Sequence, residues 1–83
     1  MAYVLYGTEA CHLCELAQQV IVEVAAHIPI EVYVEDIAES EQLVASLGTR
    51  IPVLKDEQSG RELDWPFNHD ELFVWLNHKE TLS

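Results

Sequence analysis

Residues 3–24 read YVLYGTEACHLCELAQQVIVEV, and the spacing of apolar residues changes inside this stretch. Residues 3–6 are aromatic, β-branched or aliphatic, and a glycine follows them, so we expect a short strand. Across residues 13–28 the apolar positions recur at helical spacing, with Glu and Gln between them, and Pro29 should end that helix. The stretch therefore predicts a strand followed by a helix, with both cysteines of the chain at their junction.

The remainder of the chain predicts two further strand–helix units. The expected elements are a strand at 30–35, a helix at 38–47 built on Leu43, Val44 and Leu47 and ended by Gly48, a strand at 51–55, a turn at 56–60, a strand at 61–63 and a helix after residue 68. Strands 51–55 and 61–63 are close enough to form a hairpin.

The last helix has a well-marked start. Asn68 is the expected N-cap, and Glu71 completes a capping-box-like pair three residues later. Phe67 and Leu72 occupy the positions of a hydrophobic staple across that cap. Leu72, Trp75 and Leu76 then form the apolar stripe of the helix.

The order of elements is β-α-β-α-β-β-α. A strand–helix–strand opening favours a right-handed parallel crossover, and the hairpin adds an antiparallel pair. We therefore expect an α/β fold, with a mixed four-stranded sheet and helices packed on it.

Length and composition indicate one domain over residues 1–83. Apolar residues make up 49% and charged residues 23% of the 83-residue chain, which is typical of a folded domain. No apolar run approaches the roughly 18 residues of a membrane span, and the first residues lack a signal-peptide pattern. We expect a cytoplasmic monomer.

The chain is strongly acidic, with 15 Asp and Glu against four Lys and Arg and a net charge of −11. This balance excludes nucleic-acid binding and disfavours binding to an anionic membrane, because both need a basic surface. Two interpretations of the charge remain. It serves solubility, or it steers the protein toward a basic partner protein.

Cys11-His12-Leu13-Cys14 carries the candidate chemistry. A helix N-terminus has unpaired N–H groups and a partial positive charge, which favour a thiolate. Cys11 is predicted to be exposed and to attack, and Cys14 to be shielded and to resolve the mixed disulfide. Glu9 and Glu15 oppose the thiolate, but exposed carboxylates are screened, so we expect the helix terminus to dominate.

Other interpretations of the motif stay open. A structural zinc site needs about four ligands, and this motif supplies two. The alternative function is a non-enzymatic module that binds a subunit-bridging iron–sulfur cluster or soft metal through Cys11 and Cys14, or that only docks a partner. Two inert buried cysteines are a further alternative. His12 either stabilises the Cys11 thiolate or is only a polar residue in an exposed first turn.

At this point the sequence resembles the thioredoxin superfamily, and more closely the small glutaredoxins, over nearly its whole length. The stretches that carry the resemblance are Leu5-Tyr6-Gly7-Thr8, Cys11-His12-Leu13-Cys14, Arg50-Ile51-Pro52-Val53-Leu54 and Glu62-Leu63-Asp64-Trp65-Pro66-Phe67. They look like a bacterial glutaredoxin-like group with a C-H-L-C site and an R-I-P-V-L strand. The resemblance implies a thioredoxin fold with strand order 2-1-3-4 flanked by three helices, and a dithiol–disulfide oxidoreductase.

The resemblance also implies roles for residues outside the cysteine motif. Pro52 would be cis and lie against the cysteines, and the backbone of Ile51 would bind an extended partner chain; an ordinary proline at a strand start is the alternative. Arg50 is the cation placed to meet a carboxylate near the site, or an ordinary loop cation. Trp65 either offers a flat surface to a partner or plugs the end of the sheet.

The chain departs from glutaredoxins where glutathione would bind. The Gly-Gly-x-Asp stretch that holds its γ-glutamyl end is replaced by Leu63-Asp64-Trp65-Pro66-Phe67-Asn68. Thr8-Glu9-Ala10 stands where a basic residue usually precedes the motif. We therefore expect weak use of glutathione, and a protein disulfide or protein reductase as partner. No cofactor is required for this chemistry, and an iron–sulfur cluster belongs to the alternative reading.

Overall fold

The structure is a computed structural model that describes residues 2–77. Its elements in chain order are β1 (Ala2–Gly7), α1 (His12–Ala25), β2 (Glu31–Asp36), the 3₁₀ helix η1 (Ile37–Glu39), α2 (Glu41–Leu47), β3 (Val53–Asp56), β4 (Glu62–Asp64) and α3 (His69–Asn77). The predicted order of strands and helices is confirmed, with one short 3₁₀ helix added.

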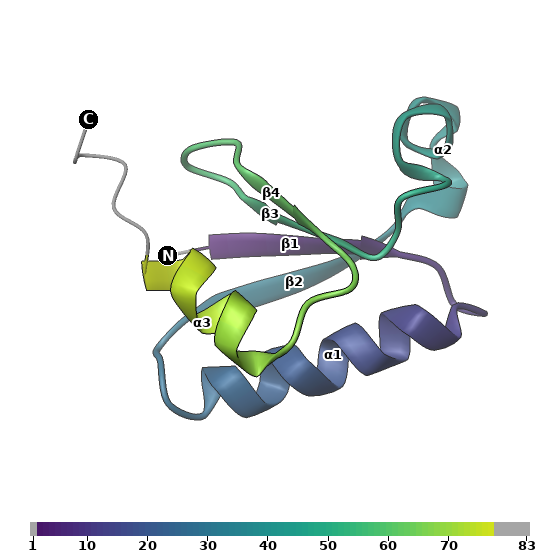
Figure 1. The fold of residues 1–83 in the computed structure, drawn as a ribbon. Coiled ribbons are helices and arrows are strands. Elements are labelled where there is room, and N and C mark those ends of the chain that lie inside the picture. Colours follow the sequence, from purple (N-terminus) through teal and green to yellow (C-terminus); the bar gives the residue numbers. More distant parts are fainter. Residues whose placement is uncertain (1, 78–83) are drawn as a thin grey trace.

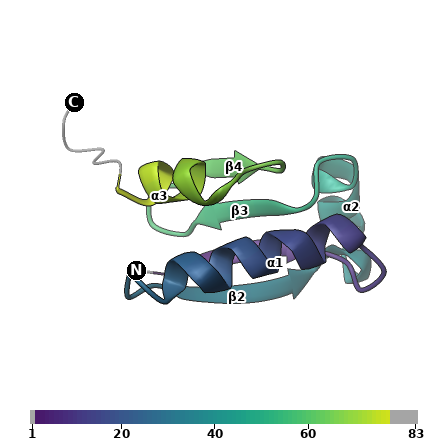
Figure 2. The same cartoon turned by 60° about the horizontal axis from the view of Figure 1, so that its bottom comes forward.

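The four strands form one mixed sheet in the order β2-β1-β3-β4, as the thioredoxin-fold prediction required. β1 runs parallel to β2 and antiparallel to β3, and β3 pairs antiparallel with β4. Figures 1 and 2 show α1 and α3 together on one face of the sheet, while α2 lies on the other side at one end. The N-terminus of α1 and helix α2 lie at that same end, which is where the site is built.

Helix α1 is held to the sheet by one buried stripe, made of Cys14, Ala17, Ile21 and Val24. The prediction placed Leu13 on this stripe, and that is wrong, because the Leu13 side chain is 46% exposed. The helix also ends at Ala25, three residues before the predicted end. The N–H groups of residues 27 and 28 still bond to the Val24 carbonyl, so the chain turns before Pro29 is reached.

The predicted helix over 38–47 is interrupted at Ser40. This residue has an extended backbone, and its hydroxyl accepts a hydrogen bond from the Leu43 N–H, so Ser40 is the N-cap of α2. Asp36 caps the preceding 3₁₀ turn in the same way through the Ala38 N–H. Two competing caps therefore divide the segment. Val44 is 47% exposed and does not belong to the core, contrary to the prediction.

The predicted start of α3 is confirmed. The Glu71 N–H donates to Asn68 Oδ1 over 2.7 Å, and the Glu71 carboxylate accepts from the Asn68 N–H over 3.0 Å, which completes the capping box. Phe67 and Leu72 are both buried in the main core. Leu76 is buried beside them, so α3 closes the core that α1 and the sheet begin.

Strands β2 to β4 each begin one or two residues later than predicted. For β3 the reason is visible in the backbone: the Ile51 N–H bonds to the Leu47 carbonyl, so Ile51 completes the end of α2. Pro52 has no N–H to give to a neighbouring strand. In residues 2–77, no helix combines the length and the apolar character needed to cross a membrane.

Candidate active site

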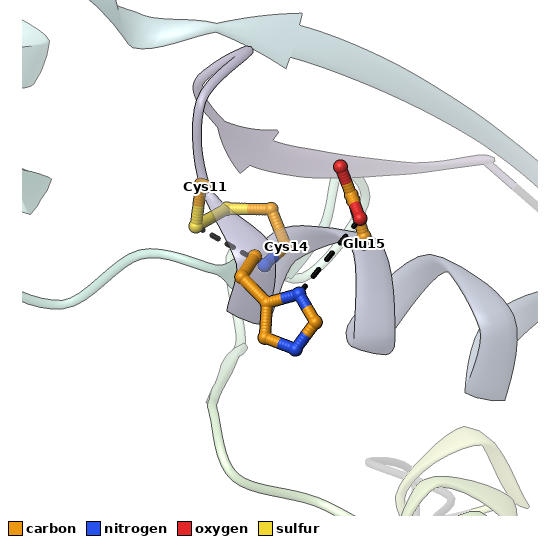
Figure 3. The surroundings of a disulfide bond; sticks show 4 residues. Cys11, Cys14 and Glu15 are labelled. Atoms are coloured by element: carbon orange, nitrogen blue, oxygen red, sulfur yellow. Dashed lines mark hydrogen bonds and ion pairs between the residues drawn. A yellow bond between two sulfur atoms is a disulfide. The ribbon is translucent and has the colours of Figure 1, made fainter.

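The two cysteines lie at the junction of β1 and α1, and their sulfur atoms are joined in a disulfide (Figure 3). Their Cα atoms are 5.1 Å apart, which is within the range that a disulfide bridges. Cys11 is the N-cap of α1 and Cys14 lies in its first turn. The helical offset of three residues thus brings the two side chains together, as the motif spacing predicted.

The two sulfur atoms have unequal surroundings. Cys14 is only 4% exposed and belongs to the buried stripe of α1, whereas Cys11 is partly exposed. The Cys14 N–H points at Cys11 Sγ, with an N–S distance of 3.1 Å. In the reduced protein the same N–H would stabilise a thiolate on Cys11, together with the positive end of α1. This arrangement suits an attacking Cys11 and a shielded Cys14.

His12 is directed to a carboxylate in the first turn of α1. Its Nδ1 lies 3.9 Å from the Glu15 carboxylate, and both side chains are largely exposed. Figure 3 shows Glu15 close to the disulfide, in the first turn of α1. A role of His12 in stabilising the Cys11 thiolate stays a prediction.

A groove of about 180 Å³ adjoins the disulfide on the side of β2. Its lining is mostly apolar and includes Leu5, Val34 and both cysteines. The side chains with carboxylates that line it are those of Glu9, Glu15 and Asp36. Asp36 was not among the predicted site residues. The parallel pairing of Gly7 with Asp36 brings the end of β2 to the cysteine loop, and the sequence alone does not reveal that register.

Pro52 lies at the same end of the sheet. It directly precedes Val53, which pairs with Tyr6 of β1, and the Ile51–Pro52 peptide bond is cis. The Pro52 carbonyl accepts a hydrogen bond from the Trp65 N–H over 3.1 Å. The Ile51 N–H is bonded within the chain to the Leu47 carbonyl, and the binding of an extended partner by the Ile51 backbone stays a prediction.

Arg50 is engaged within the chain. Its guanidinium makes two hydrogen bonds to Asp64, of 2.9 and 2.7 Å, and one of 2.7 Å to Glu62. The hydrogen bonds from Arg50 lower the pKa of the Asp64 carboxyl below its ordinary value. The sequence placed Arg50 near the site but did not reveal these partners, which lie 12 and 14 residues away across the β3–β4 hairpin.

Trp65 packs inward. Its ring meets the buried Phe67 edge-on, with centroids 5.0 Å apart and planes at 76°, and it packs against the main core. The Trp65–Pro66 bond is also cis. These contacts favour the reading of Trp65 as a side chain that closes the end of the sheet, with part of its surface still accessible.

Within residues 2–77 the structure contains no set of ligands for a structural zinc site. No three His, Cys, Asp or Glu side chains of this range are gathered in an arrangement that could hold a metal ion.

The sequence and the structure are both similar to known proteins. The glutaredoxin-like domain family (DUF836) matches residues 3–77. The crystal structure of the protein XcR50 from X. campestris is 36% identical and has a TM-score of 0.81, with 90% of this chain and 95% of that chain covered. Protein Ne2328 from Nitrosomonas europaea is 28% identical, with a TM-score of 0.77 and 89% and 88% covered.

Thioredoxin 1 from Thermosipho africanus shares the fold at 17% identity, with a TM-score of 0.59 and 92% and 94% of the two chains covered. This likeness confirms the thioredoxin fold. A comparison with curated proteins gave no match.

Proposed function

Because this chain belongs to the glutaredoxin-like domain family (DUF836), we propose that it is a thiol–disulfide oxidoreductase that exchanges electrons with a protein disulfide. The observation that carries the proposal is the Cys11–Cys14 disulfide at the N-terminus of α1, with Cys11 partly exposed and Cys14 buried. Low exposure of the second thiol favours attack by Cys11 on the partner and closure by Cys14.

In the reduced protein the Cys11 thiolate attacks one sulfur of the partner disulfide. A bond forms between Cys11 Sγ and that sulfur, the partner S–S bond breaks, and the departing thiolate takes a proton from solvent. Cys14 then loses its proton and attacks Cys11 Sγ, which closes the Cys11–Cys14 disulfide and releases the second partner thiolate. Two electrons have passed to the partner, and a dithiol reductant restores the protein by the reverse steps.

A protein partner fits the surroundings better than glutathione does. Glutathione carries two carboxylates, and Arg50, the cation on this part of the chain, is already bound to Asp64 and Glu62. The groove beside the disulfide adds further carboxylates. Like charges at close range oppose the binding of a small anion, whereas the Ile51 carbonyl can bind an extended protein segment.

Trapping tests the proposal. Cys14→Ser should accumulate a mixed disulfide between Cys11 and its partner, because the resolving thiol is gone. Cys11→Ser is the matched control and should accumulate none, since the remaining thiol is buried. Non-reducing electrophoresis followed by mass spectrometry of the linked peptides would identify the bond. If reduced wild-type protein transfers no electrons to any protein or peptide disulfide, the proposal fails.

A further inference from the structure

We infer that the groove beside the disulfide receives a lysine or arginine side chain that flanks the reacting cysteine of the partner. The inference rests on the proposed redox function and defines its substrate class: disulfides in a basic sequence context. Three features of the groove carry it, namely the disulfide that lines it, the apolar residues of its lining and the negative charge of its acidic residues.

The disulfide itself lines the groove. Both cysteines border the space of about 180 Å³, together with Gly7 at the end of β1 and Thr8 in the loop that follows. A side chain in this groove therefore lies next to the sulfur atoms that exchange. When a partner cysteine is bonded to Cys11, the residues that flank this cysteine in the partner sequence are the ones that can reach the groove.

The lining of the groove combines apolar and acidic residues. Leu5 and Val34 belong to it, and Val34 is 61% exposed, so its surface is available to a ligand. The acidic lining residues come from three elements, with Glu9 in the loop, Glu15 in α1 and Asp36 at the end of β2. Lysine and arginine match this combination, because an apolar stem carries a charged head.

Within residues 2–77, no lysine or arginine of the lining balances the acidic residues of the groove. Asp36 caps the Ala38 N–H with one oxygen, and His12 lies 3.9 Å from Glu15, which leaves most of the acceptor capacity in place. Arg50 is bound to β4 and adds no free charge. A cationic partner segment is thus favoured and an anionic one is opposed.

The test uses three peptides that carry the same disulfide, flanked by two lysines, two serines or two glutamates. Reduced protein is mixed with each peptide without oxygen, and acid-quenched chromatography gives the rate of peptide reduction. We expect the lysine peptide to react about tenfold faster than the glutamate peptide at low ionic strength. In 1 M NaCl, where the Debye length is about 3 Å, the ratio should approach one.

Two double variants separate the groove from the general charge of the protein. Glu9→Gln with Glu15→Gln should lower the lysine-to-glutamate ratio about threefold. Glu31→Gln with Glu57→Gln removes the same charge at the other end of β1, where both residues adjoin Ala2, and should leave the ratio close to that of the wild type. Circular dichroism checks that both variants are folded.

The outcomes are distinct. If all three peptides are reduced at the same rate, or if both double variants change the ratio equally, the groove inference is overturned while the oxidoreductase function stands. If none of the peptides is reduced, the proposed function falls and the inference falls with it.

Discussion

Gly7 lies directly against Cys14. A Cβ atom on Gly7 would come within 2.8 Å of Cys14 Sγ and 3.2 Å of Cys14 Cβ, and the first distance is shorter than real contacts allow. The end of β1 therefore needs a glycine so that the buried sulfur can lie beside Cys11. The buried position of the resolving thiol depends on a residue outside the C-x-x-C motif.

Gly7→Ala should destabilise the oxidised protein by about 1–3 kcal/mol, as overpacking of a filled core does. In a Cys14→Ala background the sulfur is absent, so Gly7→Ala should lower the free energy of unfolding by clearly less than in the wild type. Chemical denaturation of the four proteins gives this double-mutant cycle. Equal costs in both backgrounds would show that the Cys14 sulfur does not determine the requirement for glycine.

Cys11 should be alkylated faster than Cys14 in the folded, reduced protein. Cys11 accepts the Cys14 N–H at the helix N-terminus, whereas Cys14 is 4% exposed. A helix terminus is worth up to about 2 kcal/mol to a partly buried charge, so with burial we expect a difference of tenfold or more. The rate of iodoacetamide labelling of Cys14→Ser against Cys11→Ser measures it, with labelling in urea as the control. Faster labelling of Cys14 would reverse the assigned roles.

The redox potential should lie in the thioredoxin to glutaredoxin range, about −270 to −200 mV. The helix terminus stabilises the Cys11 thiolate, but the carboxylates of Glu9 and Glu15 in the adjoining groove oppose a second negative charge. Equilibration with glutathione redox buffers, read by mass spectrometry after thiol alkylation, gives the potential. A potential of about −120 mV would mean that the Cys11 thiolate is far more stabilised than these groups allow.

The Arg50–Asp64 pair should make stability depend on acid pH. Hydrogen bonds from Arg50 lower the pKa of the Asp64 carboxyl in the folded protein. The resulting stabilisation is fully present above the unfolded-chain value of about 3.9 and is lost as pH falls through the lower folded-state value. Because the pair is partly exposed, we expect about 1 kcal/mol or less.

Urea denaturation of wild type and Asp64→Asn between pH 7 and pH 2 measures this dependence. The wild type should have a higher free energy of unfolding than Asp64→Asn at neutral pH. This difference between the two proteins should vanish near pH 2. Glu57→Gln, at the far end of the hairpin, is the control and should show a smaller difference. A constant difference for Asp64→Asn across the whole range would contradict the role of the carboxylate charge.

The sequence by itself determined the local elements and the reactive motif. The stripe from Ala17 to Val24, the capping box of Asn68 and Glu71, and the C-x-x-C spacing all depend on neighbours within one or two helical turns. Such patterns are readable because the helix repeat fixes which side chains share a face. The order of elements, with the resemblance in its motifs, then led to the mixed sheet.

Only the tertiary structure decided which side chains surround the site. Leu13 has the periodicity of a core residue, yet its side chain stays 46% exposed. Arg50 is neutralised by carboxylates that only the β3–β4 pairing brings near, and Asp36 lines the groove beside the disulfide only through the register of β1 with β2. These contacts join residues far apart in the sequence, so no local pattern records them, and they set the charge that a partner meets at Cys11.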